Sequence, residues 1–533
     1  MSDDRLLSRR SVLAGTAAAI AAAATPAGAE TISSEAVDDT LTAAAIEAAT
    51  DPRRRTSELD LVRSSGSPTW IVEYDEGELD SLEEWSDGDD DRELLETHVE
   101  SRTAILRAST RDIGASWLDR RLGRGLAARS YIETIDANPS LSLAEPIEVL
   151  GEESEEWHDP GRLGRVLRYG GDPPVADGVA FDDVETAPMA DVVEAVSAGD
   201  LDGEPTIAVV DSGVNTGSGV FEYLGEDEDD ELEEGADGTR VLEASTNYIT
   251  DETVAEHGLA AVEDPNGHGT FVAAQMAGDP SDADHTGVLP EARILAQKAL
   301  GDDGTGSTAD IARAIRDAAD EGVDAIVLSL GSPLWSHELD RALEYAAGAG
   351  SIPVAAVGND RIATRWVASP ASSERAIAVG STTVDGASSY YSNVGPNPGT
   401  SDLSGGESTD AEVDVAAPGH AIETTVPTTS GSTEVRELSG TSMAAPVVGA
   451  IVASLDLDDV EEARELLQDT AEPTEIAAEA EVGAGIVDAD RAASGSEREE
   501  SQSEAMDSDA EVRDDAYRTE SDARGGLLLR WLT

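Results

Sequence analysis

Three residues in separate segments of the chain have the types that a nucleophilic hydrolase needs. Asp211 ends an apolar run, His268 lies between two glycines, and Ser442 follows a Gly-Thr pair. A serine hydroxyl is a weak nucleophile until an imidazole accepts its proton, and a carboxylate holds that imidazole in the required tautomer. With Ser442 as nucleophile, His268 as base and Asp211 as the orienting acid, the chain could perform acyl transfer.

A fourth segment offers a donor for the oxyanion that acyl transfer develops. The run 352–357 is typical of a strand and is followed by Gly358 and Asn359. The carboxamide of Asn359 could donate to a tetrahedral intermediate. The backbone N–H of Ser442 is a second donor, because Ser442 opens a predicted helix whose positive dipole end favours negative charge.

The segments around these residues predict how they are held. The apolar run 207–210 before Asp211 is typical of a buried parallel strand, and functional groups in α/β sheets lie beyond the carboxyl ends of strands. The glycines beside His268 allow close approach of the backbone, and 270–278 is predicted to be a helix. We expect a second helix from Ser442 to 454, with Pro446 in its first turn, where its missing N–H costs little.

Strands and helices alternate through the same part of the chain. A predicted helix over 308–321 precedes a strand over 325–330, and a helix over 337–349 precedes the strand that starts at Ile352. This alternation predicts an α/β fold with a doubly wound, mostly parallel sheet and the catalytic residues at its carboxyl edge.

The order Asp, His, Ser along the chain is that of the subtilisin-type triad. With the segments around 211, 268, 359 and 440–446, the chain resembles the subtilisin-like (subtilase) serine protease family over about residues 178–492. Secreted haloarchaeal members are the ones it resembles in particular. The resemblance implies a serine endopeptidase in which Ser442 attacks, His268 relays the proton and Asp211 orients it. Asn359 and the Ser442 N–H would hold the oxyanion.

The same resemblance implies where substrate binds. An extended peptide would add as a strand between two segments of the protein, one on each side. The primary pocket would have its floor near Ser369 and Pro370. The substrate-binding residues implied are Ser329, Leu330 and Gly331 on one segment and Gly304 and Gly306 on the opposing edge strand.

Other readings of the motifs remain open. Each motif alone is also typical of a turn or a loop, and only their ordered co-occurrence favours catalysis. A processing protease of narrow specificity and a catalytically silent subtilase-like binding protein are alternatives. A lipase-type hydrolase is disfavoured because Ser442 lacks the Gly-x-Ser-x-Gly context. The absence of cysteine excludes a thiol nucleophile, and no His-Glu-x-x-His pattern is present.

The charge of the chain indicates where it works. With 111 acidic and 35 basic residues the formal net charge is −76 and the pI is near 4.1. Self-repulsion is severe at low ionic strength and is screened at molar salt, where the Debye length is about 3 Å. Thermophily would enrich lysine, but Lys298 is the only one. We therefore expect a salt-adapted protein with an acidic surface and no nucleic-acid partner.

The first 29 residues have the pattern of an export signal. Arg9 and Arg10 precede a short alanine-rich apolar run that ends in a small-residue cleavage motif at 27–29. Adjacent arginines point to the twin-arginine export machinery, and the apolar run is too short to span a bilayer. We expect a secreted, extracellular protein with no stable membrane span, acting on protein or peptide substrates.

Composition divides the chain into six regions. These are a signal peptide (1–29), a linker (30–55), a prodomain-like α+β region (56–150), a linker or processing region (151–177), the peptidase domain (178–494) and an acidic tail expected to be disordered (495–533). Within the prodomain-like region we predict strands over 69–74, 103–108 and 129–135 and a helix over 91–99.

The prodomain-like region suggests a zymogen. A large α/β fold with many non-local contacts forms slowly, and a covering domain keeps a protease silent before export. We hypothesise that Ser442 cuts its own chain between about 151 and 205; a permanent accessory domain is the alternative. The chemistry requires no cofactor. A structural calcium ion remains open, since the acidic loop 226–234 offers oxygen ligands, and no metal ligand is assigned.

Overall fold

The computed structural model describes two parts of the chain. The first is residues 69–143, apart from 90–91, 99–101, 114–124 and 139. The second is residues 179–496, apart from 181–183, 185, 200, 202, 218–219, 222–238, 280, 333–334, 362–365, 396–411 and 475. The export signal, both linkers, the acidic loop 226–234 and the tail beyond 496 therefore lie outside the described residues.

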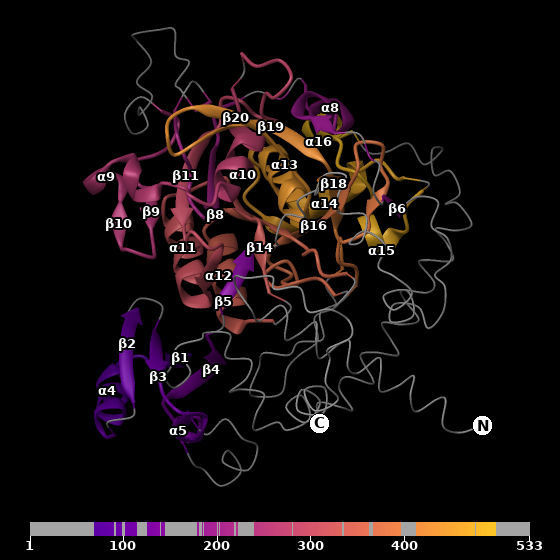
Figure 1. The fold of residues 1–533 in the computed structure, drawn as a ribbon. Helices are drawn as coiled ribbons and strands as arrows, with labels where there is room; N and C mark the ends of the chain where they lie inside the picture. The colour runs from indigo at the N-terminus through magenta and orange to yellow at the C-terminus, as the bar shows by residue number, and fades with distance from the viewer. Residues whose placement is uncertain are drawn as a thin grey trace, which may run out of the picture.

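The first part is a small antiparallel sheet with the strand order β2-β3-β1-β4, drawn in indigo and violet in Figure 1. Its core contains Trp70, Val72, Leu82 and Leu106, all fully buried. We call it the N-terminal domain. Its elements are β1 (Thr69–Tyr74), α4 (Leu79–Asp87), β2 (Glu93–His98), β3 (Thr103–Arg107), α5 (Thr110–Ile113), η1 (Leu126–Ala128) and β4 (Ile132–Ala137).

One element predicted in this domain is wrong. The segment 91–99, predicted as a helix, is strand β2 and pairs antiparallel with β3, Leu94 opposite Leu106. Hydrogen bonding to the free edge of β3 stabilises the strand more than the local sequence favours a helix, as is common for tertiary pairing. The helix of this region is α4, which buries Leu82 and Trp85 instead. The strands expected at 69–74 and 103–108 are present, and the one expected at 129–135 begins at Ile132.

The second part is built around a 10-stranded sheet with the order β10-β9-β11-β8-β13-β15-β16-β17-β6, in which β18 also pairs with β16. The central strands β11, β8, β13, β15 and β16 are all parallel. The bounds are β6 (Val179–Ala180), β8 (Thr206–Asp211), β9 (Thr246–Asn247), β10 (Glu252–Thr253), β11 (Arg293–Lys298), β13 (Ala325–Leu328), β15 (Ile352–Ala356), β16 (Ile377–Thr382), β17 (Ser388–Ser389) and β18 (Val415–Pro418).

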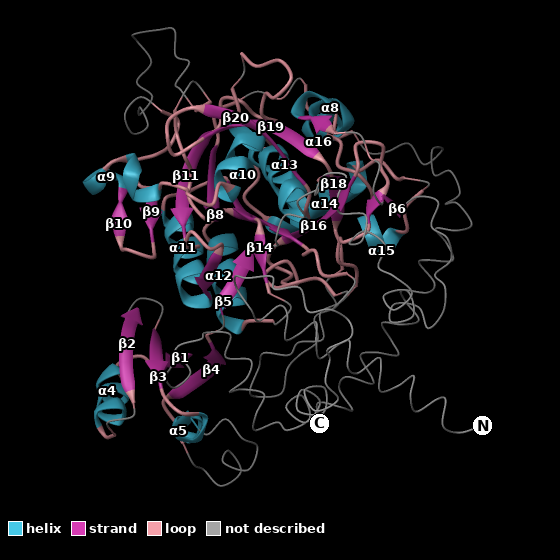
Figure 2. Cartoon of the chain, viewed as in Figure 1, coloured by secondary structure: helices cyan, strands magenta, loops and turns pink. Residues whose placement is uncertain are grey.

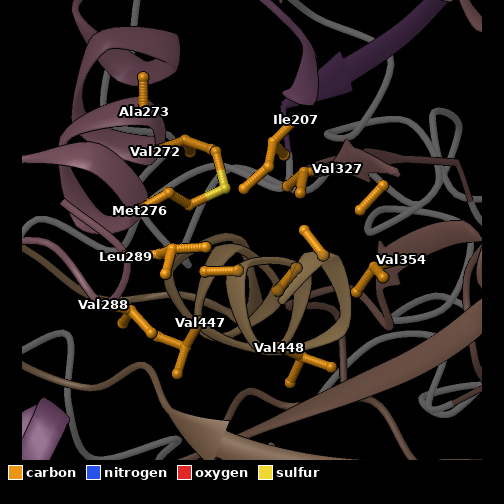
Figure 3. Packing of buried hydrophobic residues seen from close by; sticks show 14 of the residues in the cluster. Ile207, Val272, Ala273, Met276, Val288, Leu289, Val327, Val354, Val447 and Val448 are labelled. Carbon is orange, nitrogen blue, oxygen red and sulfur yellow. The ribbon is translucent and has the colours of Figure 1, made fainter. Parts of the chain in front are cut away.

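Helices cover both faces of this sheet (Figures 1 and 2). Ile207 and Val209 of β8 belong to a cluster with α10 and α13, whereas Ala208 and Val210 pack with α11 and α12. Figure 3 shows the first cluster, with Val447 and Val448 of α13 beneath the sheet. The doubly wound prediction is confirmed. The helices are α8 (Met189–Ala195), α9 (Val254–His257), η3 (Leu259–Val262), α10 (His268–Ala277), α11 (Thr308–Asp320), α12 (His337–Gly348), α13 (Thr441–Ala453), α14 (Val460–Thr470), α15 (Glu479–Val482) and α16 (Ala489–Ser494).

Helix α13 differs from its prediction in one respect. It begins at Thr441, and Pro446 lies inside the helix beyond the first turn, so the expected first-turn position is wrong. Proline lacks the N–H that would bond the carbonyl four residues earlier, which belongs to Ser442. That carbonyl instead accepts a hydrogen bond from the Ser329 hydroxyl at 2.8 Å.

Two small sheets complete the fold. One has the order β20-β19-β7 and contains β7 (Ala187–Pro188), β19 (Ile422–Pro427) and β20 (Thr433–Leu438). The other has the order β12-β5-β14 and contains β5 (Ser140–Leu143), β12 (Thr305–Ser307) and β14 (Leu330–Gly331). The second sheet joins the two parts of the chain, because β5 belongs to the first part and β12 and β14 belong to the second. In the regions that the structure describes, no helix has the length and apolar character to cross a membrane.

Candidate active site

Asp211 and His268 form a buried pair at the carboxyl edge of the main sheet. Asp211 is the last residue of β8, and both of its carboxylate oxygens lie within hydrogen-bond distance of Nδ1 of His268, at 2.9 and 3.0 Å. Each side chain is 1% exposed. Because Nδ1 faces the carboxylate, we assign the ring proton of a neutral imidazole to Nδ1, which leaves Nε2 as an acceptor.

The backbone at His268 depends on its flanking glycines. Gly267, the N-cap of α10, has a left-handed φ of 83°, which glycine adopts without strain. A Cβ on Gly269 would lie 2.3 Å from the Gly213 carbonyl and 3.0 Å from Cβ of Asp211. Only glycine lets the start of this helix approach the end of β8 so closely, which brings His268 to Asp211.

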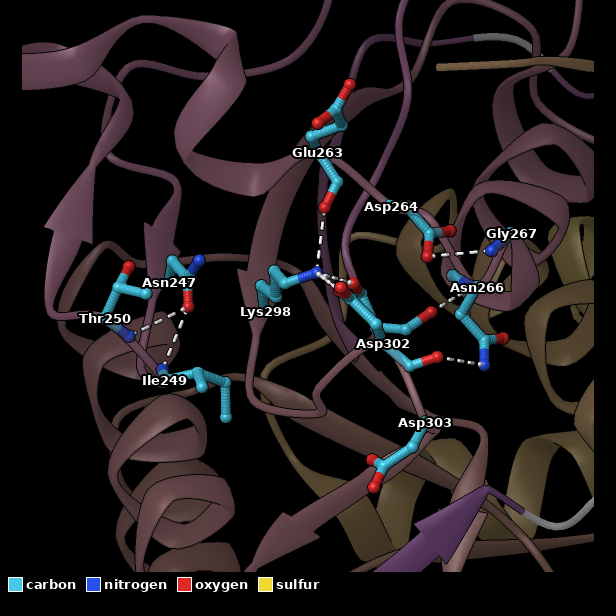
Figure 4. A network of polar contacts seen from close by, with 12 residues as sticks. Asn247, Ile249, Thr250, Glu263, Asp264, Asn266, Gly267, Lys298, Asp302 and Asp303 are labelled. Atoms are coloured by element: carbon cyan, nitrogen blue, oxygen red, sulfur yellow. Dashed lines mark hydrogen bonds and ion pairs between the residues drawn. The ribbon is translucent and has the colours of Figure 1, made fainter. Parts of the chain in front are cut away.

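Asp264 also fixes the start of α10, and the sequence analysis missed it. Its buried carboxylate accepts hydrogen bonds from the backbone N–H of Gly267 and of Thr270, both at 2.9 Å, and from the Thr270 hydroxyl at 2.7 Å. Figure 4 shows Asp264 beside Gly267. A carboxylate that caps a helix N-terminus satisfies its free N–H groups. The spacing Asp-x-x-Gly before His268 was the available signal.

Ser442 is the second residue of α13, which packs against α10. Its hydroxyl donates to the carbonyl of Ser329 at 3.2 Å. Nε2 of His268 is buried and has no hydrogen-bond partner among the described residues. The structure therefore shows the Asp211–His268 contact but no hydrogen bond from Ser442 to Nε2, a contact that in unliganded enzymes often forms only with substrate.

Asn359 follows β15 and is held by the residue before Ser442. Its Oδ1 accepts hydrogen bonds from the backbone N–H and from the hydroxyl of Thr441, both at 2.9 Å. These two bonds assign the orientation of the carboxamide. Its Nδ2 group then lies at the start of α13, where a Cβ on Gly440 would be 3.1 Å away. Asn359 and the Ser442 N–H thus lie at the same helix N-terminus.

A buried ion pair anchors the chain just after Asn359. The guanidinium of Arg361 contacts the carboxylate of Glu481, and these side chains are 1% and 0% exposed. The same guanidinium donates to the Ser388 hydroxyl at 3.2 Å, and the Arg361 N–H donates to the Tyr391 carbonyl at 3.1 Å. Sequence reasoning did not find this pair, because its members are 120 residues apart.

The implied substrate-binding segments form the outer strands of one small sheet. Leu330 and Gly331 make up β14, Ser329 precedes them, Gly306 lies in β12, and Gly304 precedes that strand. A strand of the chain itself, β5, lies between β14 and β12 and is antiparallel to both. Its alternating Ser-Leu-Ser-Leu sequence was the signal that the sequence analysis did not use.

The expected pocket floor lies beside β14. Ser332 and Ser369 exchange two backbone hydrogen bonds of 2.9 Å. A Cβ on Gly331 would lie 3.2 Å from Cβ of Ala368 and 3.3 Å from the Ser369 carbonyl. Gly331 therefore contacts the segment that the family resemblance named as the floor.

In the described part of the chain, no group of three or more His, Asp or Glu side chains is placed to hold a metal ion. The acidic loop 226–234 lies outside that part.

The chain is similar in sequence to known serine proteases. The model of the Subtilase family matches residues 202–499. A thermophilic serine proteinase of a Bacillus species is 37% identical over 213 residues, covering 39% of this chain and 48% of that protein. Halolysin of Haloferax mediterranei is 36% identical over 184 residues, covering 34% and 32%. The chain spans about half the length of the first of these relatives.

Among solved structures, fervidolysin of Fervidobacterium pennivorans has the same fold. Its TM-score is 0.54 at 19% identity, covering 82% of this chain and 62% of that one. The family match extends over more than half of the chain and includes all four of the residues placed at the sheet edge. The chain belongs to the subtilase family.

Proposed function

We propose that the protein is a serine endopeptidase that hydrolyses peptide bonds through an acyl-enzyme. The observation that carries this is the buried contact of Asp211 with Nδ1 of His268, which leaves Nε2 unpaired at the edge where α13 begins with Ser442. Membership of the subtilase family and the serine proteinases among its relatives support it.

The proposed reaction has two halves. Oγ of Ser442 attacks the peptide carbonyl while Nε2 of His268 takes its proton, and Asp211 stabilises the imidazolium. Asn359 and the Ser442 N–H donate to the oxyanion. The C–N bond then breaks, the leaving amine takes the proton from His268, and water hydrolyses the acyl-enzyme by the same steps.

We propose that substrates bind as an extended strand between β14 and β12. The support is β5, which occupies that place with the register Leu143 opposite Leu330 and Leu141 opposite Gly306. Backbone pairing of this kind accepts many side chains, and a mostly small, uncharged lining of glycine, serine and alanine favours an apolar or broad preference. A narrow processing specificity is the alternative.

We also propose that the N-terminal domain keeps the enzyme silent until it is cut off. Strand β5 blocks the place of substrate, and the domain docks on the surface helices: Ile71 and Ile105 pack on Ala309 of α11, and Glu73 pairs with Arg341 of α12. A cut that frees it must fall after Leu143, as the proposed stretch 151–205 does. A permanent accessory domain is the alternative.

Location and salt adaptation are part of the proposal. The twin arginines at 9–10 and the net charge of −76 support export by the twin-arginine machinery into a salty extracellular medium. The similarity to halolysin of Haloferax mediterranei supports the adaptation to salt. We also propose a structural calcium ion. If it is bound, EDTA should lower the thermal stability of the protein and leave the chemical step of peptide hydrolysis unchanged.

The test is casein hydrolysis in molar NaCl by the full chain, beside Ser442→Ala, with intact-mass analysis of both. Wild type is expected to digest casein and lose its N-terminal domain, and the variant to do neither. If wild type digests casein but keeps that domain, the accessory reading holds. If the folded wild type cuts neither casein nor a library of mixed peptides, the protein is a silent binding module.

A further inference from the structure

Lys298, the only lysine of the chain, lies next to the candidate catalytic residues. It is the last residue of β11, directly opposite Asp211 in the parallel register of β11 and β8. The residue is 5% exposed, in a protein whose other positive charges all come from arginine. Burying an ammonium is costly unless its donors are satisfied, so its contacts need an explanation.

The ammonium makes three contacts, one for each of its N–H donors. Nζ donates to the carbonyl of Ser212 at 2.7 Å, to the carbonyl of Glu263 at 2.8 Å and to Oδ1 of Asp302 at 3.3 Å. Figure 4 shows the ammonium between Glu263 and Asp302. Two of the three acceptors are backbone carbonyls, so the ammonium fixes the main chain at two points.

Those two carbonyls belong to the segments that carry the candidate acid and base. Ser212 follows Asp211, and its N–H donates to the Asp211 carboxylate at 2.7 Å. Glu263 precedes Asp264, whose carboxylate caps the helix that starts with His268. One buried cation therefore ties the end of β8 to the loop that leads into α10.

We infer that Lys298 is a positioning residue of the proposed peptidase: its ammonium sets the distance between Asp211 and His268 by joining the chain segments on which they lie. This inference rests on the proposed function. Lys298 acts through the backbone, and its burial keeps it from serving as a binding charge for substrate. Small misplacements of catalytic groups can cost about 10²-fold in rate.

The arrangement of the three acceptors explains why lysine and not arginine occupies position 298. A compact ammonium can point three donors at three separate acceptors, whereas the planar guanidinium has its donors in a fixed fork. Lys298→Arg keeps the charge and loses this arrangement. It should therefore recover only part of the function that Lys298→Met loses.

The experiment compares wild type, Lys298→Met and Lys298→Arg in molar NaCl. It measures kcat and KM on a peptide p-nitroanilide and the rate at which diisopropyl fluorophosphate modifies Ser442. We expect Lys298→Met to lower kcat and the modification rate by about 10- to 100-fold with KM within about twofold, and Lys298→Arg to be intermediate. Arg375→Met, which removes a half-exposed positive charge, is the matched control and should equal wild type.

Hydrogen exchange gives a readout that needs no activity. In the Ser442→Ala background, Lys298→Met should speed amide exchange over 264–270 relative to the parent.

If Lys298→Met does not fold, Asp302→Ala removes only the longest of the three contacts and should show the same changes to a smaller extent. The inference would be overturned if folded Lys298→Met had the kcat of wild type. It would also be overturned if Lys298→Met lost both kcat and stability and Lys298→Arg restored both fully. A wild type inert to diisopropyl fluorophosphate would instead count against the proposed function, and unchanged exchange against the role of Lys298.

Discussion

Ser329 and Ser442 are hydrogen bonded to each other in both directions. Oγ of Ser329 donates to the Ser442 carbonyl at 2.8 Å, and Oγ of Ser442 donates to the Ser329 carbonyl at 3.2 Å. The first bond exists because Pro446 supplies no N–H to the Ser442 carbonyl. The pair joins the residue before β14, in the proposed substrate-binding segment, to the start of α13, which carries the proposed nucleophile.

Ser329→Ala should therefore destabilise the protein. It removes the hydroxyl that donates to the buried Ser442 carbonyl, and losing such a buried hydrogen bond costs about 1–3 kcal/mol of unfolding free energy. Denaturation in molar salt, in the Ser442→Ala background to prevent autolysis, measures the loss. Ser430→Ala, which removes an exposed hydroxyl that bonds only to nearby turn residues, is the control. Equal stability of both variants would show that another donor or water reaches the carbonyl.

Asn359→Ala should lower kcat while leaving KM nearly unchanged, because in the proposed reaction the carboxamide donates to charge that develops only in the transition state. We expect a loss of about 10²- to 10³-fold, a range taken from subtilisin itself. Initial rates on a peptide p-nitroanilide measure it. Thr441→Val keeps one of the two bonds to Oδ1 and should lose less. A KM effect as large as the kcat effect would place Asn359 in ground-state binding instead.

Gly306→Ala should weaken the binding of extended substrates. Its Cβ would lie 2.1 Å from the Ala299 carbonyl and 2.7 Å from Leu300, so β12 must shift away from the main sheet. We expect KM for a long peptide to rise about tenfold, equivalent to 1.4 kcal/mol, with a smaller effect on a short one. Gly348→Ala, where a Cβ meets no atom within 4 Å, is the control. The prediction fails if KM rises equally for both peptide lengths.

His285 should make stability depend on pH. Burial lowers its pKa, but hydrogen bonds to Glu423 and Asp282, each at 3.2 Å, outweigh this and raise the pKa above its ordinary value. A group whose pKa is higher in the folded state than in the unfolded state stabilises the folded protein. This stabilisation is fully present at pH values below the unfolded-state pKa of about 6.5 and is lost as the pH rises through the folded-state pKa. The difference in melting temperature between the parent and His285→Gln, in the Ser442→Ala background, should therefore be larger at pH 6 than at pH 9. A difference that grows with pH would contradict this assignment.

Breaking the buried ion pair of Arg361 and Glu481 should be costly. Arg361→Met leaves the Glu481 carboxylate buried without its cation, which typically costs about 3–5 kcal/mol. The double variant Arg361→Met with Glu481→Gln should recover part of this loss. Arg464→Met, which removes another arginine that pairs with carboxylates but lies closer to solvent, should cost less. Chemical denaturation of wild type and the three variants measures the free energy of unfolding. It decides whether the ion pair or the packing of the arginine stem contributes more to that free energy.

The sequence by itself determined the residue types and most of the elements that carry them. The apolar runs that end at Asp211 and before Asn359 are strands, and the periodic segments at 308–321 and 337–349 are helices, because these patterns are local. The glycines around His268 were also predictable, since a close approach tolerates no other side chain.

Only the tertiary structure decided which distant groups meet. His268 lies 57 residues from Asp211, Ser329 lies 113 from Ser442, and Lys298 lies 86 from Ser212. No local pattern encodes such contacts. The same holds for segment 91–99, which is a strand because β3 offers an edge, and for β5, which pairs with strands from another domain. Hydrogen bonds and pairing between remote segments depend on where the whole chain places them, and this is why the contacts of Lys298 and Glu481 became visible only in the fold.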